Sequence, residues 1–164
     1  MLMPVVTDVC LKPDSIRVPA LIISAIEAEL ECVGADPCRS DVIMSEQPTQ
    51  RGAELEGPDS QGRLWVREVS DNADTPGQPC SSWTRTLEIG IVRCHHTTGA
   101  GGSGLPDPSW YALESRRAYV DKEAVAAAVS TMKHPRVTLT GWRPYGPSSY
   151  AIGGIWTVTY QHWR

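Results

Sequence analysis

The segment WTRTLEIGIVRC, residues 83–94, is the strongest strand signal in the chain. Its residues alternate in character, so that Leu87, Ile89 and Ile91 point one way while Thr86, Glu88 and Gly90 point the other. The segment is longer than the usual strand of about five or six residues. We therefore expect it either to extend beyond its sheet or to bend at Gly90.

Three other segments predict strands to pair with it. Arg63–Val69 is rich in residues that favour sheets, and Val137–Trp142 and Ile155–Trp163 follow later in the chain. A short strand at Asp41–Met44 is a further candidate. The residues Pro144–Pro147 predict a turn between the last two strands.

The last strand carries bulky side chains on both faces. One face holds Trp156, Val158 and Tyr160, and the other holds Ile155, Thr157, Thr159 and Trp163. Two interpretations stay open: a central strand covered on both sides within one subunit, or a strand with helices on one face and a neighbouring subunit on the other. The pair Gly153–Gly154 permits a bulge or the close approach of another backbone.

Two helical regions flank these strands. The first is capped by Asp14 or Ser15, tolerates Pro19 in its first turn, and ends before Gly34 and Pro37. Its apolar stripe consists of Val18, Ile22, Ile26, Leu30 and Val33.

The second region starts at Asp107 or Ser109, runs to about Lys133, and is expected to break near Asp121, which would cap a second segment. Its buried stripe consists of Ala124, Val125, Ala128, Val129 and Met132.

This order of elements predicts an α+β fold, in which a small mixed or antiparallel sheet is flanked by helices. We expect a single domain, 1–164, with an N-terminal arm over 1–14. Long extended loops are expected over 34–61, 70–82 and 97–108. Loops of this length are usually functional or disordered. A small core with large loops suits a subunit that packs against neighbouring copies.

Composition argues against several classes of protein. The net charge of −4 and the scattered Lys and Arg do not favour nucleic-acid binding, and Arg116–Arg117 is best explained as a solvated helix face. Met1–Val9 lacks the features of a secretory signal, and Val18–Ile26 is too short to span a membrane. The sequence therefore predicts a soluble chain made in the cytosol.

An odd number of cysteines argues against a disulfide framework, although Cys32 and Cys38 could close a short loop.

The segment Gly99–Gly104 matches the dinucleotide pattern GxGxxG, but this match is weak. In the true fingerprint the last glycine already packs the helix onto the strand, whereas here four residues, Leu105–Pro108, intervene. A flexible loop explains the glycines better, and we predict no cofactor.

Cys94, His95 and His96 form the densest cluster of possible metal ligands, and Cys80 could join them across a hairpin. Adjacent residues of a strand point to opposite faces, and the paired cysteine spacing of zinc sites is missing. We therefore predict no metal site.

Glu54 and Glu56 lie in a loop without an apolar pocket, and no nucleophile motif occurs, so we predict that the chain is not an enzyme and has no catalytic residues.

Three segments together resemble the tail terminator proteins of long-tailed, siphovirus-type phages, especially those that infect actinobacteria. These segments are GRLWVR at 62–67, WTRTLEIGIVRC at 83–94, and YGP at 145–147 followed by GGIWTVT at 153–159. The resemblance covers roughly residues 15–162. It implies a tail-terminator-like α+β fold without enzymatic activity or cofactor.

The resemblance also implies a structural virion protein of the phage neck, assembled in the host cytoplasm. Such proteins form a hexameric ring that caps the tail tube and joins it to the head connector. The implied partners are further copies of the chain, the tail tube protein and the connector or stopper proteins, with DNA passing through the channel without specific binding. A head-completion protein of the same neck, either stopper or adaptor, is an alternative, and a small nucleotide-binding domain is a weaker one. Acidic residues that face a channel would repel passing DNA, and the candidates are Glu54, Glu56, Asp59, Asp71 and Asp74.

Overall fold

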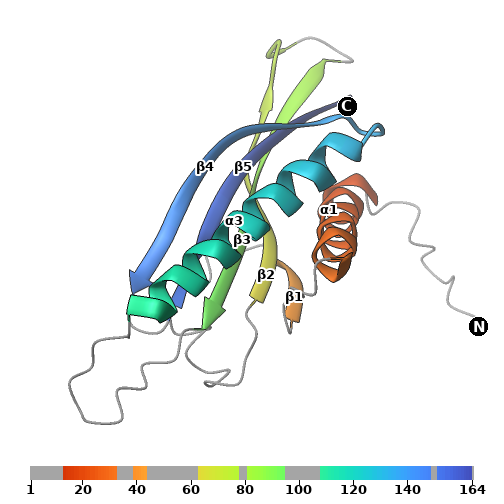
Figure 1. Cartoon of the computed structure of the whole chain (residues 1–164). Helices are drawn as coiled ribbons and strands as arrows, with labels where there is room; N and C mark the ends of the chain where they lie inside the picture. The colour runs from red at the N-terminus through yellow and green to blue at the C-terminus, as the bar shows by residue number, and fades with distance from the viewer. Residues whose placement is uncertain are drawn as a thin grey trace, which may run out of the picture.

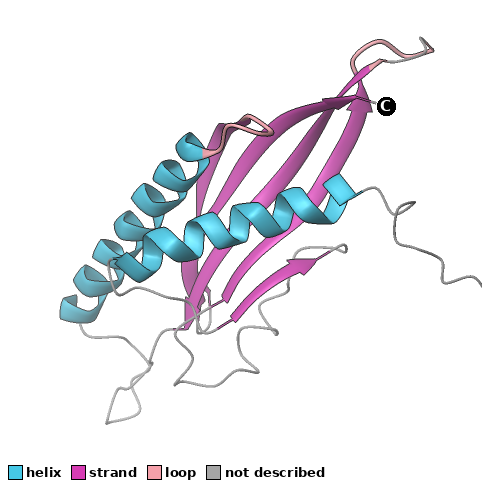
Figure 2. Ribbon diagram, turned by 90° about the vertical axis from the view of Figure 1, so that its right-hand side faces the viewer, coloured by secondary structure: helices cyan, strands magenta, loops and turns pink. Residues whose placement is uncertain are grey.

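A computed structural model describes residues 13–32, 39–43, 63–77, 81–94, 108–148 and 151–163. The described elements are α1 (Pro13–Cys32), β1 (Arg39–Ile43), β2 (Arg63–Ala73), β3 (Ser82–Cys94), α3 (Pro108–Thr131), β4 (Val137–Ser148) and β5 (Ala151–Trp163). The five strands form one sheet, and both helices lie on the same face of it (Figures 1 and 2). The predicted α+β class is confirmed.

The sheet has the strand order β1-β2-β3-β5-β4. Strand β1 pairs in parallel with β2, and the other neighbours pair antiparallel, so the sheet is mixed. The helices divide its face between them: α1 packs on β1 and β2, while α3 packs on β4 and β5 and alongside α1. Strands β1 and β4 are the two edges.

The long central strand does not extend beyond the sheet, and its pairing continues without interruption through Gly90. All residues from Ser82 to Cys94 pair in continuous register with β5, which runs equally far. Gly90 has another role, because a Cβ there would lie only 2.1 Å from the indole of Trp65 on β2. The glycine makes room for a buried tryptophan on the face that lies opposite the two helices.

The hydrophobic core forms where the helices meet the sheet. Strand β3 contributes Leu87, Ile89 and Ile91, which are buried as their alternation predicted. Helix α1 contributes its predicted stripe as far as it is described. Helix α3 contributes Ala124, Val125, Ala128 and Val129, and Met132, one residue beyond the end of α3, packs partly buried against the core. The remaining members are Ile23 of α1 and six residues of β2, β4 and β5: Leu64, Val66, Val137, Trp156, Val158 and Tyr160.

Strand β5 lies between β3 and β4, so it is a central strand. Trp156, Val158 and Tyr160 face the helices, and Ile155 on the opposite face is also buried. Burial within one subunit therefore accounts for Ile155 and for the helix-facing residues of this strand.

Several predicted boundaries were wrong at the ends of the elements. Helix α1 begins at Pro13, which places Pro13–Asp14 in the helix rather than in an arm and Pro19 beyond the first turn. Strand β2 continues to Ala73, so Ser70–Ala73 is not part of a loop; β3 stabilises this extension by pairing with it. Two other expectations are confirmed: the short strand expected within the loop over 34–61 is β1, at Arg39–Ile43 rather than Asp41–Met44, and α3 begins at Pro108, within the expected start of that helix.

Two further expectations were wrong because tertiary contacts override local signals. Helix α3 does not break near Asp121, since this carboxylate pairs with Arg93 instead of capping a new segment. The residues Pro144–Pro147 belong to β4 rather than to a turn. Proline is tolerated there because β4 is an edge strand, which needs ladder hydrogen bonds on one side only.

Candidate interaction site

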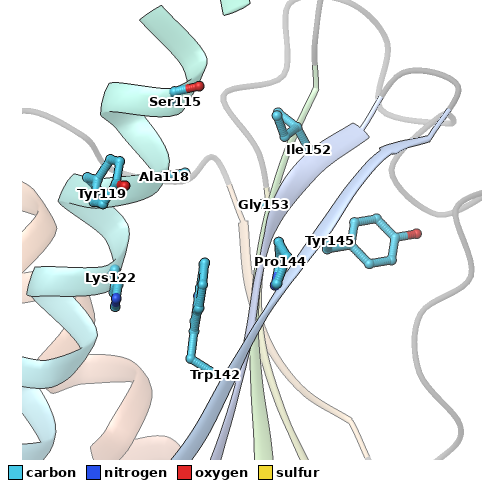
Figure 3. A pocket seen from close by; sticks show the side chains of 9 residues that line it. All are labelled: Ser115, Ala118, Tyr119, Lys122, Trp142, Pro144, Tyr145, Ile152 and Gly153. Carbon is cyan, nitrogen blue, oxygen red and sulfur yellow. The ribbon is translucent and has the colours of Figure 1, made fainter. Parts of the chain in front are cut away.

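A hollow of about 210 Å³ lies between α3 and the end of the sheet formed by β4 and β5 (Figure 3). We call it the α3–β4 groove. It is lined by Ser115, Ala118, Tyr119, Lys122, Trp142, Pro144, Tyr145, Ile152 and Gly153. The lining is mostly apolar, and it sits beside an unpaired sheet edge.

Trp142 stands between α3 and the strands (Figure 3). It pairs with Trp156 across β4 and β5, so both indoles are on the helix-bearing face. Gly154 permits this packing, because a Cβ there would lie 2.7 Å from Nε1 of Trp142 and 2.9 Å from the ring of Trp156. Trp142 nevertheless keeps 42% of its surface exposed, since α3 does not cover the edge strand fully.

Helix α3 supplies the other wall of the groove. The ammonium of Lys122 lies 4.8 Å from the ring centroid of Trp142, within range of a cation–π interaction. Tyr119, one turn before, is 68% exposed. The groove thus presents two accessible aromatic rings and one cation.

A buried ion pair holds α3 against the sheet at this point. Arg93 of β3 donates two hydrogen bonds to Asp121, from Nε at 2.9 Å and from the terminal nitrogen at 2.5 Å. Both side chains are almost fully buried. Because Asp121 precedes Lys122, the pair also sets the rotation of α3 that turns Lys122 towards Trp142.

A second polar cluster lies at the end of the sheet where β2 and β5 finish and β3 begins. Buried Arg85 donates hydrogen bonds to Asp71 at 2.7 Å and to the Tyr160 hydroxyl at 3.0 Å. His162 also contacts Asp71, at 2.8 Å. Nε of Arg85 lies 3.2 Å from Glu68 but outside hydrogen-bond geometry. These contacts join three adjacent strands.

The charges of this cluster perturb one another. Burial would raise the pKa of Asp71, but hydrogen bonds from Arg85 and His162 outweigh it and hold that pKa below its ordinary value. Burial would likewise lower the pKa of Arg85, but Asp71 and Tyr160 raise it. Asp71, one of the candidate channel residues, is therefore engaged within its own subunit, whereas Asp74 is exposed and bonded to Ser82 and Thr84.

The groove offers mostly apolar surface with aromatic rings and one ammonium group. Its lining residues include no carboxylate and no imidazole. Within the described parts of the chain, no cluster of three His, Cys, Asp or Glu residues could hold a metal ion. An apolar partner with an acidic rim would suit the aromatic rings and Lys122.

Most residues considered for chemistry on sequence grounds lie outside the described residues: Cys38, Glu54, Glu56, Asp59, Cys80, His95, His96 and Gly99–Gly104. Cys94 is the last residue of β3, and Cys32 is an exposed free thiol at the end of α1. Arg116 and Arg117 are exposed on α3, as expected of a solvated helix face.

Sequence reasoning missed Tyr119, Lys122 and Trp142 as a site. The only local signal is Trp142 in a strand, two residues before Pro144, since a proline within a strand indicates an edge strand. Their meeting depends on how α3 lies across the sheet.

Comparison with protein-family models and with curated proteins finds no match to this chain. Among the described helices, none is both long and apolar enough to cross a lipid bilayer.

Proposed function

We propose that this chain is a structural subunit that assembles with copies of itself into a ring. Within that class, we propose the tail terminator of a long-tailed phage, which caps the tail tube and meets the head connector. The observation that carries the proposal is the exposed aromatic surface of Trp142 and Tyr119 beside the unpaired edge strand β4. Contiguous exposed apolar surface marks interaction sites in soluble proteins.

The location of the resembling segments adds support. Residues 63–67 of the first segment fall on β2, WTRTLEIGIVRC falls on β3, and the last segment falls on β4 and β5. These are four neighbouring strands of one sheet, so the likeness follows a continuous structural unit. The chemistry of the groove, which offers aromatic rings and one cation, also agrees with an assembly role.

The test is electron microscopy and native mass spectrometry of the purified full chain, together with antibody labelling of virions. We expect closed rings with a central channel and label at the junction of head and tail. Loss of the protein should yield tail tubes of uncontrolled length, since nothing would stop tube growth. Normal tails joined to leaking heads would instead assign the stopper or adaptor role. A chain that forms no ring and is absent from virions would refute the proposal.

A further inference from the structure

We infer that the α3–β4 groove of one copy binds the solvent-facing side of α1 in the next copy. This inference deepens the proposed function by naming the two surfaces through which the ring would close. The α1 outer face, as we call the second surface, consists of six exposed residues of that helix: Arg17, Ala20, Leu21, Ser24, Ala28 and Glu31.

The two surfaces lie over different halves of the sheet. Helix α1 packs on β1 and β2, and the groove is lined from β4 and β5 (Figure 1). The strand order puts β1 and β4 at opposite edges. A contact between two different surfaces of the same chain is head-to-tail, and repetition of such a contact generates a ring or a filament.

The charges are complementary at one end of the two surfaces. Glu31 of the α1 outer face is exposed in the last turn of the helix, and no basic residue lies in that turn. The carboxyl end of a helix adds partial negative charge. Across from it, the groove holds Lys122.

The shapes also match. Ala20, Ser24 and Ala28 are small and share one side of α1, around an exposed Leu21. Small residues let a large ring approach the helix backbone closely. The rings of Trp142 and Tyr119 are such partners, because 42% and 68% of their surfaces stay exposed. Arg17 lies near the opposite end of α1 from Glu31, about 20 Å away at 1.5 Å per residue.

The experiment is sedimentation velocity of the full chain with one variant on each surface. Trp142→Arg blocks the groove and Leu21→Arg blocks the α1 outer face. We expect the wild type to self-associate and each variant to sediment as a monomer. An equimolar mixture should form a dimer, because the Leu21→Arg copy keeps an intact groove and the Trp142→Arg copy keeps an intact α1 outer face.

Charge reversal supplies a second, milder pair of variants. Lys122→Glu and Glu31→Lys should each weaken association about tenfold at low salt, and combining them should restore much of the loss. Asn72→Arg, on an exposed position of β2, is the matched control and should associate like the wild type. Circular dichroism checks that each variant is folded; if Trp142→Arg is not, Lys122→Glu takes its place in the mixture.

The inference is overturned if the wild type stays monomeric up to about 1 mM, the limit of a weak interface. A mixture that remains monomeric while the wild type associates would overturn it too, as would a Leu21→Arg variant that associates normally. If two copies instead paired symmetrically through their β4 edges, the Leu21→Arg variant would associate normally. These tests need no virion, so the interface and the proposed function can fail separately. If the mixture forms dimers but the protein is absent from virions, only the proposed function is refuted. If the protein forms neck rings that tolerate both variants, only this interface is refuted.

Discussion

Arg93 of β3 and Asp121 of α3 form a two-point ion pair that is almost wholly buried, and it is the polar contact that ties the long helix to the middle of the sheet. Neither side chain is close to the other in sequence. The pair determines where α3 lies and therefore where Lys122 meets Trp142.

Removal of one partner of this pair should be costly. Asp121→Ala removes the carboxylate that accepts two hydrogen bonds from buried Arg93, so we expect a loss of about 3–5 kcal/mol in the free energy of unfolding. Glu123→Gln, an exposed change two residues further on, should cost less than about 0.5 kcal/mol. Urea denaturation measures both, and equal losses would contradict the assigned role of the pair.

Asp71 should make stability depend on pH in the acid range. Its folded pKa lies below the ordinary value of 3.8, so its contribution is present above about pH 4 and is lost as the pH falls through the folded pKa. Asp71→Asn should therefore lower stability by about 1–3 kcal/mol at neutral pH. The gap between variant and wild type should narrow at pH 3, as thermal melts would reveal. An unchanged gap at both pH values would argue against this assignment.

Gly90 and Gly141 form a matched pair of glycines within strands. A Cβ at Gly90 would clash with the buried Trp65 indole at 2.1 Å, whereas at Gly141 it would meet Thr157 at an ordinary 3.8 Å. Gly90→Ala should destabilise the protein by about 1–3 kcal/mol through overpacking. Gly141→Ala should be neutral or slightly stabilising. Melting temperatures distinguish the two, and a harmless Gly90→Ala would show that Trp65 is free to move.

Leu21 and Ile22 are neighbours on α1 with opposite environments. Ile22 is fully buried in the core, while Leu21 is 39% exposed. Ile22→Ala should cost about 2–5 kcal/mol, and Leu21→Ala should cost less than about 1 kcal/mol. Chemical denaturation at a concentration where the chain is monomeric isolates this difference. A reversed order of the two losses would mean that α1 is rotated from the orientation described.

Periodicity was sufficient for the elements whose burial follows a simple repeat. The alternation of residues 83–94 and the helical stripe of α1 predicted strand and helix correctly, because a single buried face imposes a period on the sequence. The local sequence signal was misleading where a residue interacts with a distant partner. Asp121 has the sequence context of a helix cap, yet its carboxylate forms an ion pair with Arg93. Ser70 has the sequence context of a loop, yet it pairs with β3 as part of the sheet.

The sequence by itself determined the α+β class, the buried sides of β3 and of α1, and the lack of a recognisable catalytic motif, because these depend on residue type and on spacing along one element. Only the tertiary structure decided that β1 joins in parallel, that β4 lies at an edge, and that Tyr119, Lys122 and Trp142 share one groove. Strand order and helix placement arise from contacts between segments far apart in the chain. No local period records such contacts, so the surface proposed for assembly emerged only from the folded protein.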